Sequence, residues 1–249
     1  MLIRDVVHGV HLIDHAHVNS YLIEGEDGLT LVDAGLPGLW HELGTTIRDL
    51  GHRPEDVRAL VLTHAHFDHI GTARRLVHRL GIPVYVHSQD AELAARPHRY
   101  AHENPRALYP IRHPRAIPVL TSMLAAGAVV SMLQGVRGTL PLAPGTTLDV
   151  PGRPRVLATP GHTHGHVALH LPDRDAVITG DALVTLDPYT GRTGPRIVAG
   201  AATADSAQAL ASLDTIAATG AEHVLPGHGA PWSSGAEAAV ARAHAAGPA

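Results

Sequence analysis

Four apolar runs in this chain each lead into a loop that carries histidine or aspartate close to glycine. The first run, RALVL at residues 58–62, leads into THAHFDHIG, where three histidines and an aspartate fall within six positions. The other three are RVLATPGH, AVITGD and EHVLPGH. Loops that follow apolar strands are where α/β architectures place their chemistry. The pattern therefore predicts a site assembled from the ends of four strands.

The four loops together supply five imidazoles and two carboxylates, all of them side chains that bind metals. On an α-helix, His64 and His66 would lie on nearly opposite faces, whereas an extended loop lets them converge. Imidazole and carboxylate without thiolate suit zinc, and also iron, manganese or cobalt. The set is large enough for two divalent ions, with zinc as the first expectation. Its members are His64, His66, Asp68, His69, His162, Asp181 and His228.

Missing residue types exclude several other chemistries. The chain has no cysteine, which removes disulfides, thiolate nucleophiles and cysteine metal ligands. Its 19 basic residues are all arginine, so lysine Schiff-base mechanisms are excluded. A net charge of -4 lacks the basic footprint of a nucleic-acid binder. Because the first residues do not form an export signal, we expect a cytoplasmic protein that acts on a small molecule.

Between the loops, the sequence predicts strands and helices in alternation. VNSYLIEG and LTLVDAG, at residues 18–25 and 29–35, are expected to form a hairpin, followed by a helix at 38–51 that Gly51 closes. A short helix at 88–96 is expected to begin with Ser88 as its cap. Further helices are predicted at 71–81 and 202–220, and further strands at 58–62, 82–87, 154–161, 166–172, 175–181 and 221–229.

A proline- and arginine-rich stretch interrupts this alternation from Pro97 to about Gly138. It is too short to bury a core of its own, so we predict a single domain, residues 1–249, with a helical insertion or cap at about 97–138. The apolar segment 117–135 contains proline, glycine and hydroxyl residues and falls short of a clean membrane span. We expect it to form a buried or lid-forming helix and expect no membrane partner.

Two interpretations of this insertion stay open. In one, the arginines form an anion-binding rim above an apolar pocket, as suits an acyl thioester, a lactone or a lipophilic phosphoester. In the other, the arginines are solvated above a core helix or a homodimer contact. The candidate substrate-binding residues are Arg96, Arg99, Arg112 and Tyr189.

The string HAHFDH resembles the H-x-H-x-D-H signature of the metallo-β-lactamase-fold hydrolases. VDAG, TPGH, GD and PGHG stand in that superfamily's order, so the resemblance covers nearly the whole chain. It implies an α/β (α+β) fold, a four-layer αββα sandwich of two mixed β-sheets flanked by helices, with the metals where the sheets meet. By resemblance, the ligands divide into His64, His66 and His162 for a first ion, Asp68, His69 and His228 for a second, and Asp181 for both.

The resemblance also implies supporting residues. Asp33 in LVDAG stands where relatives keep an acid that orients a ligating histidine, although a turn-forming role for it stays open. His166 fits a supporting role better than a ligand role. Among the glyoxalase II and lactonase-like members, the lactonases carry a substrate-polarising tyrosine three residues after the bridging aspartate. Val184 occupies that position here, and Tyr189 is the candidate to reach the same space.

The resulting hypothesis is a dinuclear-metal hydrolase in which a metal-bound hydroxide attacks a thioester, lactone or phosphoester bond. Asp68 would orient the hydroxide and carry a proton to the leaving group. One alternative is a persulfide dioxygenase-like oxidoreductase, with a single iron held by His64, His162 and Asp181. A further alternative is a metal-binding protein without catalysis.

Overall fold

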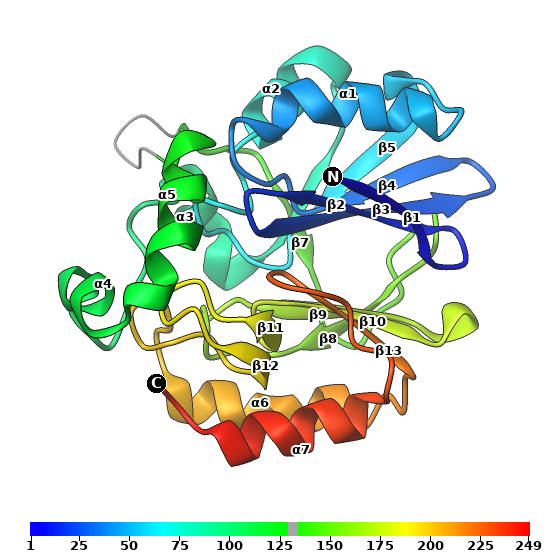
Figure 1. Ribbon diagram of the computed structural model, residues 1–249. Helices are drawn as coiled ribbons and strands as arrows, with labels where there is room; N and C mark the ends of the chain where they lie inside the picture. Colours follow the sequence, from blue (N-terminus) through cyan, green and yellow to red (C-terminus); the bar gives the residue numbers. More distant parts are fainter. Residues whose placement is uncertain (129–133) are drawn as a thin grey trace.

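Two mixed β-sheets lie face to face between two pairs of helices in the computed structural model, which describes residues 1–128 and 134–249 (Figure 1). This arrangement confirms the predicted four-layer sandwich. Helices α1 (Leu39–Asp49) and α2 (Ala73–Leu80) cover the outer face of the first sheet. Helices α6 (Ser206–Ala217) and α7 (Ala236–Ala246) cover the outer face of the second.

The strands of the first sheet follow one another in chain order. The first four form an antiparallel meander, and the fourth to the seventh run parallel. They are β1 (Leu2–Val7), β2 (Val10–His15), β3 (Val18–Gly25), β4 (Gly28–Val32), β5 (Val57–Val61), β6 (Val84–His87) and β7 (Leu140–Leu142).

The second sheet pairs its strands in the order β13, β10, β9 and β8. Strands β13 and β10 are parallel, and the other two pairings are antiparallel. A separate two-stranded ribbon lies between β10 and β13 in the chain. The bounds are β8 (Arg155–Ala158), β9 (Val167–Leu171), β10 (Ala176–Gly180) and β13 (His223–Pro226), with β11 (Val184–Leu186) and β12 (Thr193–Arg196) in the ribbon.

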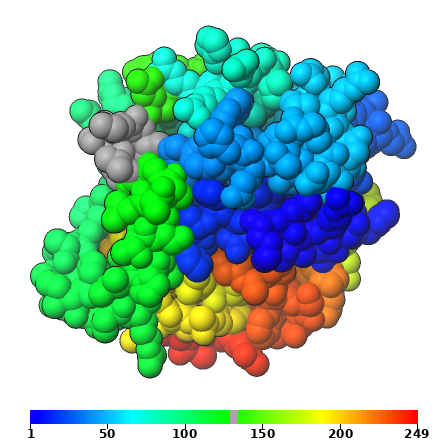
Figure 2. All heavy atoms as spheres, turned by 45° about the horizontal axis from the view of Figure 1, so that its top comes forward, coloured from blue at the N-terminus to red at the C-terminus, as the bar shows by residue number. Residues whose placement is uncertain are grey.

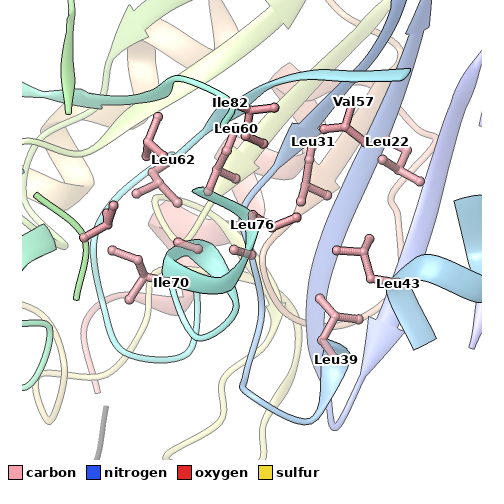
Figure 3. Close-up of a cluster of buried hydrophobic side chains, with 14 of the residues drawn as sticks. Leu22, Leu31, Leu39, Leu43, Val57, Leu60, Leu62, Ile70, Leu76 and Ile82 are labelled. Atoms are coloured by element: carbon pink, nitrogen blue, oxygen red, sulfur yellow. The ribbon is translucent and has the colours of Figure 1, made fainter. Parts of the chain in front are cut away.

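Strands in both sheets are apolar on both faces, which explains why the sequence shows continuous apolar runs. In β3, Leu22 packs towards the helices while Tyr21 faces the second sheet. In β10, Val177 packs towards α6 and α7 while Ile178 faces the first sheet. Figure 3 shows the apolar layer between the first sheet and its helices, where Leu22, Leu31 and Leu60 meet Leu39, Leu43 and Leu76 of α1 and α2. Three buried apolar layers thus hold the four structural layers together.

Most predicted elements are present. The hairpin is β3 and β4, and helix α1 ends just before Gly51, which has a left-handed backbone with φ of +89°. The prediction that Ser88 caps a helix is wrong. Ser88 is the first residue of a 3-10 turn, η2 (Ser88–Asp90), and the cap is His87, because its Nδ1 atom accepts the Gln89 N–H. Strands β1, β2, β7, β11 and β12 and helix α7 lie outside the elements that the sequence predicted.

The predicted insertion contains short helical turns that form a lobe beside the sandwich, coloured green in Figure 2. Helix α5 (Ile117–Ala125) packs inwards through Val119 and Met123 and ends before Gly127. The rest of the predicted 117–135 helix includes residues 129–133, which lie outside the described residues. The described helices include none long and apolar enough to cross a membrane. These turns are η3 (Arg106–Leu108), α4 (Tyr109–Arg112), η4 (Pro114–Ala116) and α5 (Ile117–Ala125).

Candidate metal centre

The seven predicted ligand side chains come together where β5, β8, β10 and β13 end. All seven are buried, and the most exposed of them is Asp68 at 6%. Two groups of three contain ligand atoms that all lie within 4.8 Å of one another: His64, His66 and His162, and Asp68, His69 and His228. These are the two groups that the resemblance implied.

Asp181 lies between the two groups. One of its oxygens, Oδ2, is 3.5 Å from His162 Nε2 and 3.2 Å from His228 Nε2. The other, Oδ1, is 3.5 Å from His69 Nε2. The carboxylate can therefore reach ligands of both groups. It sits so close to the neighbouring loop that a Cβ at residue 227 would lie 2.1 Å from Oδ1, which explains the glycine in PGHG.

Asp33 lies against this cluster and forms a third group with His64 and His69. Its carboxylate is already engaged, because Oδ1 accepts the Thr63 N–H and Oδ2 accepts the Thr63 hydroxyl, both at 2.8 Å. Oδ2 also lies 3.0 Å from His69 Nδ1. The residue directly follows β4 and has a left-handed backbone, with φ of +58°. The contact with His69 fits an acid that orients a ligating histidine, and the positive φ is the backbone feature that fits the turn-forming interpretation.

Hydrogen bonds at Nδ1 orient His162 and His228. The Thr203 hydroxyl donates to Val198 O, so its oxygen accepts from His162 Nδ1 at 3.3 Å. His228 Nδ1 donates to the carbonyl oxygen of His17 at 2.7 Å. Fixing Nδ1 in this way sets the ring orientation and directs Nε2 into the cluster.

His162 Nε2 lies 2.9 Å from His66 Nδ1, whereas the Nε2 atoms of the other candidate ligands have no hydrogen-bond partner among the described residues. Within the described ranges, no hydrogen bond reaches the buried Nε2 atoms of His64, His69 and His228 or the Oδ1 atom of Asp181. Buried polar atoms without partners are rare in folded proteins and call for an explanation. Convergent imidazole nitrogens and carboxylate oxygens are the donor set of divalent transition metals, so these residues fit metal ions.

The pKa values divide the histidines into two kinds. Burial lowers the pKa of His64 and His66, and it lowers the pKa of His162 to about 4. Burial also opposes the charged form of His228, but the carboxylates of Asp181 and Asp68 outweigh it and raise the pKa to about 10. The pKa of His69 is raised in the same way. The side of the cluster that holds the carboxylates therefore favours positive charge.

Comparison with known proteins identifies the family. The family model described as "Metallo-beta-lactamase superfamily" matches residues 13–228. The chain belongs to this superfamily. A probable metallo-hydrolase of Bacillus subtilis (strain 168), YflN, is 26% identical, and the match covers 90% of this chain and 85% of that protein. An N-acyl homoserine lactonase from Bacillus sp is 24% identical over 71% of each chain.

Solved structures of the superfamily agree with the fold. The metallo-beta-lactamase family protein TTHA1429 from Thermus thermophilus is 30% identical with a TM-score of 0.66, covering 97% of this chain and 81% of that one. TTHA1623 in a di-iron-bound form is 29% identical with a TM-score of 0.61, covering 89% and 92%.

The predicted substrate-binding residues are only partly brought together. Arg96 and Arg99 line a cavity of about 320 Å³ beside α3 (Ala91–Ala95), where Arg96 pairs with Glu92. Arg112 lies on α4 and is exposed. Tyr189 is linked to the candidate ligands by Tyr100, a residue that the sequence analysis did not single out. The hydroxyl oxygens of the two tyrosines are 3.1 Å apart.

Tyr100 is one of two site residues that the sequence analysis missed. Its ring lies against the imidazole of His66, with 4.2 Å between centroids, and the Arg106 guanidinium lies 3.9 Å above the ring. Burial raises the pKa of Tyr100 and of Tyr189, so both hydroxyls stay protonated at neutral pH. The second missed residue is Asp90, which is as buried as the ligands, at 2% exposed. A tyrosine in an arginine-rich stretch and an aspartate in a short helix carry no local signal for these positions.

Proposed function

We propose that this protein is a dinuclear metal-dependent hydrolase of ester-like bonds, with thioesters, lactones and phosphoesters as the substrate classes. The observation that carries the proposal is the pair of buried three-residue groups around Asp181, in which the Nε2 atoms of His64, His69 and His228 have no hydrogen-bond partner in the described part of the chain. Two divalent ions bound there would lower the pKa of a shared water from about 15.7 towards about 7 and would polarise a carbonyl or phosphoryl oxygen. Zinc is the first metal we propose, and iron or manganese is the second.

The chain's own residues would divide the work as follows. His64, His66 and His162 would bind one ion as neutral imidazoles, which their lowered pKa values favour. Asp68, His69 and His228 would bind the other, and Asp181 would contact both. Asp33 and His166 would hold ligands in position without binding metal.

Asp68 is proposed to move the proton. It is the most exposed member of the ligand set, and its Oδ2 atom lies 3.4 Å from His228 Nε2. From there the carboxylate can orient the attacking water and carry its proton to the leaving group. A positioned acid or base of this kind typically contributes a factor of about 10² to 10⁴ in rate.

The hydroxyl pair of Tyr100 and Tyr189 is proposed to position the substrate. The Tyr100 ring lies beside His66, and the pair is near enough to Asp68 for that carboxylate to add to the effect of burial in raising the pKa of both tyrosines. In a hydrogen bond between two hydroxyls, one proton remains free to be donated elsewhere. That proton could bind the carbonyl oxygen of a substrate.

A substrate panel tests the proposal. Protein loaded with zinc, iron or manganese would be assayed on one aryl ester, one acyl thioester, one lactone and one aryl phosphodiester. We expect metal-dependent hydrolysis of at least one class, retained in His164→Ala and reduced at least about 100-fold in Asp68→Ala. Oxygen consumption with a persulfide and no hydrolysis would instead support the dioxygenase alternative. Bound metal with neither activity would support the non-catalytic alternative.

A further inference from the structure

Asp90 is a buried carboxylate that the mechanism above does not use. It is 2% exposed and ends the short turn η2. Its Oδ2 atom accepts hydrogen bonds from the Ala65 N–H at 3.2 Å and from the Thr163 hydroxyl at 2.7 Å. Its Oδ1 atom accepts the Gly165 N–H at 2.9 Å.

These three donors belong to two loops that supply metal ligands. Ala65 stands between His64 and His66, in the loop that follows β5 of the first sheet. Thr163 and Gly165 stand in the loop between β8 and β9 of the second sheet, directly after His162. A single carboxylate thus connects the two loops that carry the first ligand group.

The contact leaves no room for a different arrangement at residue 165. A Cβ there would lie 2.7 Å from both the backbone nitrogen and the Oδ1 atom of Asp90, so glycine permits the approach. Three residues of the GHTHGH motif can therefore be explained by their contacts. His162 is a ligand candidate, His166 contacts Asp181, and Gly165 admits Asp90.

A simpler role for Asp90, that of helix cap, does not account for its side chain. Asp90 directly precedes α3, but its carboxylate makes no capping hydrogen bond to that helix. Nor does Asp90 belong to any of the metal-binding groups found within residues 1–128 and 134–249. Its oxygens serve the two histidine loops instead, and these bonds offset the cost of burying the carboxylate.

We propose that Asp90 is a positioning residue that holds His64 and His66 at their metal-binding separation from His162. The inference rests on the proposed function, because it concerns the same metal site. The second ligand group is anchored differently: His69 lies against Asp33, and His228 donates to His17 O. Loss of Asp90 should therefore weaken the first ion much more than the second.

Chelator competition on Asp90→Asn tests this. Asparagine keeps the shape, but its amide nitrogen cannot accept hydrogen bonds, so at least one donor loses its partner. We expect affinity for one of the two ions to fall about 10- to 100-fold, while affinity for the other changes less than about threefold. Glu92→Gln is the matched control, because Glu92 is an exposed carboxylate two residues away, and it should behave as wild type. Unchanged affinity for both ions, or equal loss of both, would overturn the inference.

A second pair of variants covers poor folding of Asp90→Asn. Thr163→Val removes one hydrogen bond and keeps the carboxylate, whereas Thr163→Ser keeps the hydroxyl. We expect Thr163→Val to weaken the first ion and Thr163→Ser to restore wild-type affinity. Equal affinities in these two variants would contradict the role given to Asp90.

Amide hydrogen exchange on metal-free protein separates this inference from the proposed function. In Asp90→Asn or Thr163→Val, the amides of Ala65 and Gly165 should exchange at least about tenfold faster than in wild type, since the link between their loops is weakened. Unchanged exchange at both amides would overturn the link itself. A wild-type protein that binds no metal would overturn the proposed function, and with it the metal role of Asp90, even if exchange shows that the link exists.

Discussion

The Nε2 atom of His166 accepts a hydrogen bond from the backbone N–H of Asp181 at 3.1 Å. Its Nδ1 atom lies 2.8 Å from the Thr159 hydroxyl, which fixes the ring. His166 is fully buried among the candidate ligands but directs its lone pair to a backbone amide. The His166 imidazole thus holds Asp181 in its position between the two ligand groups.

Replacing His166 should therefore weaken metal binding without removing a ligand. We expect His166→Ala to lower metal affinity about 10- to 100-fold, the usual cost of losing a residue that supports a ligand. His164→Ala is the matched control, because His164 lies two residues away in the same loop and is exposed. Chelator competition on both variants measures the effect. Equal affinities in the two variants would contradict the role of His166.

Asp33 should support His69 through its negative charge. Asp33→Asn keeps the size of the side chain and tolerates the left-handed backbone at φ of +58°, so the change isolates the carboxylate. We expect roughly tenfold weaker binding of one ion and a loss of about 1–3 kcal/mol in the free energy of unfolding of the metal-free protein. Chelator competition and denaturant unfolding measure the two effects. Asp27→Asn, at an exposed hairpin position, should change neither.

Metal binding should release protons. In the metal-free protein, the pKa of His228 is raised to about 10 and that of His69 is also raised, so both are protonated at pH 7. A metal ligand must be unprotonated, so we expect release of about two protons per chain and an affinity that increases from pH 6 to pH 8. Calorimetry in buffers of different ionisation enthalpy counts the protons. An affinity independent of pH, with no proton release, would show that these histidines are not ligands.

The tyrosine hydroxyls should affect turnover rather than metal binding. Tyr189→Phe and Tyr100→Phe each remove one hydroxyl of the pair, and Tyr100→Phe keeps the ring that packs beside His66. We expect kcat/KM to fall about 10- to 100-fold in each, with unchanged metal content, because a hydrogen bond to the reacting oxygen is lost. The double variant should be little worse than either single variant, since the two hydroxyls act as a pair. Additive losses would indicate independent roles.

The ligand loops could be predicted from the sequence because each follows an apolar strand and concentrates its ligands in a few positions. The four layers of the sandwich could also be predicted, because strands such as β3 and β10 are apolar on both faces. The roles of Tyr100 and Asp90 could not be predicted from the sequence. These two residues contact Tyr189 and Gly165, which are 89 and 75 residues away, through tertiary contacts that no local pattern records. The prediction for Ser88 was wrong because the 3-10 turn begins at Ser88 itself, which makes the preceding residue, His87, the cap.

The most direct test of the dinuclear site is the metal content of the purified protein under metal-replete conditions, measured by elemental analysis beside Asp181→Ala. Asp181 lies within 3.5 Å of His69, His162 and His228, so its loss should affect both ions. We predict two divalent ions per chain in the wild type and fewer in Asp181→Ala. A wild-type protein without metal, or with a single ion that Asp181→Ala retains, would contradict the dinuclear site.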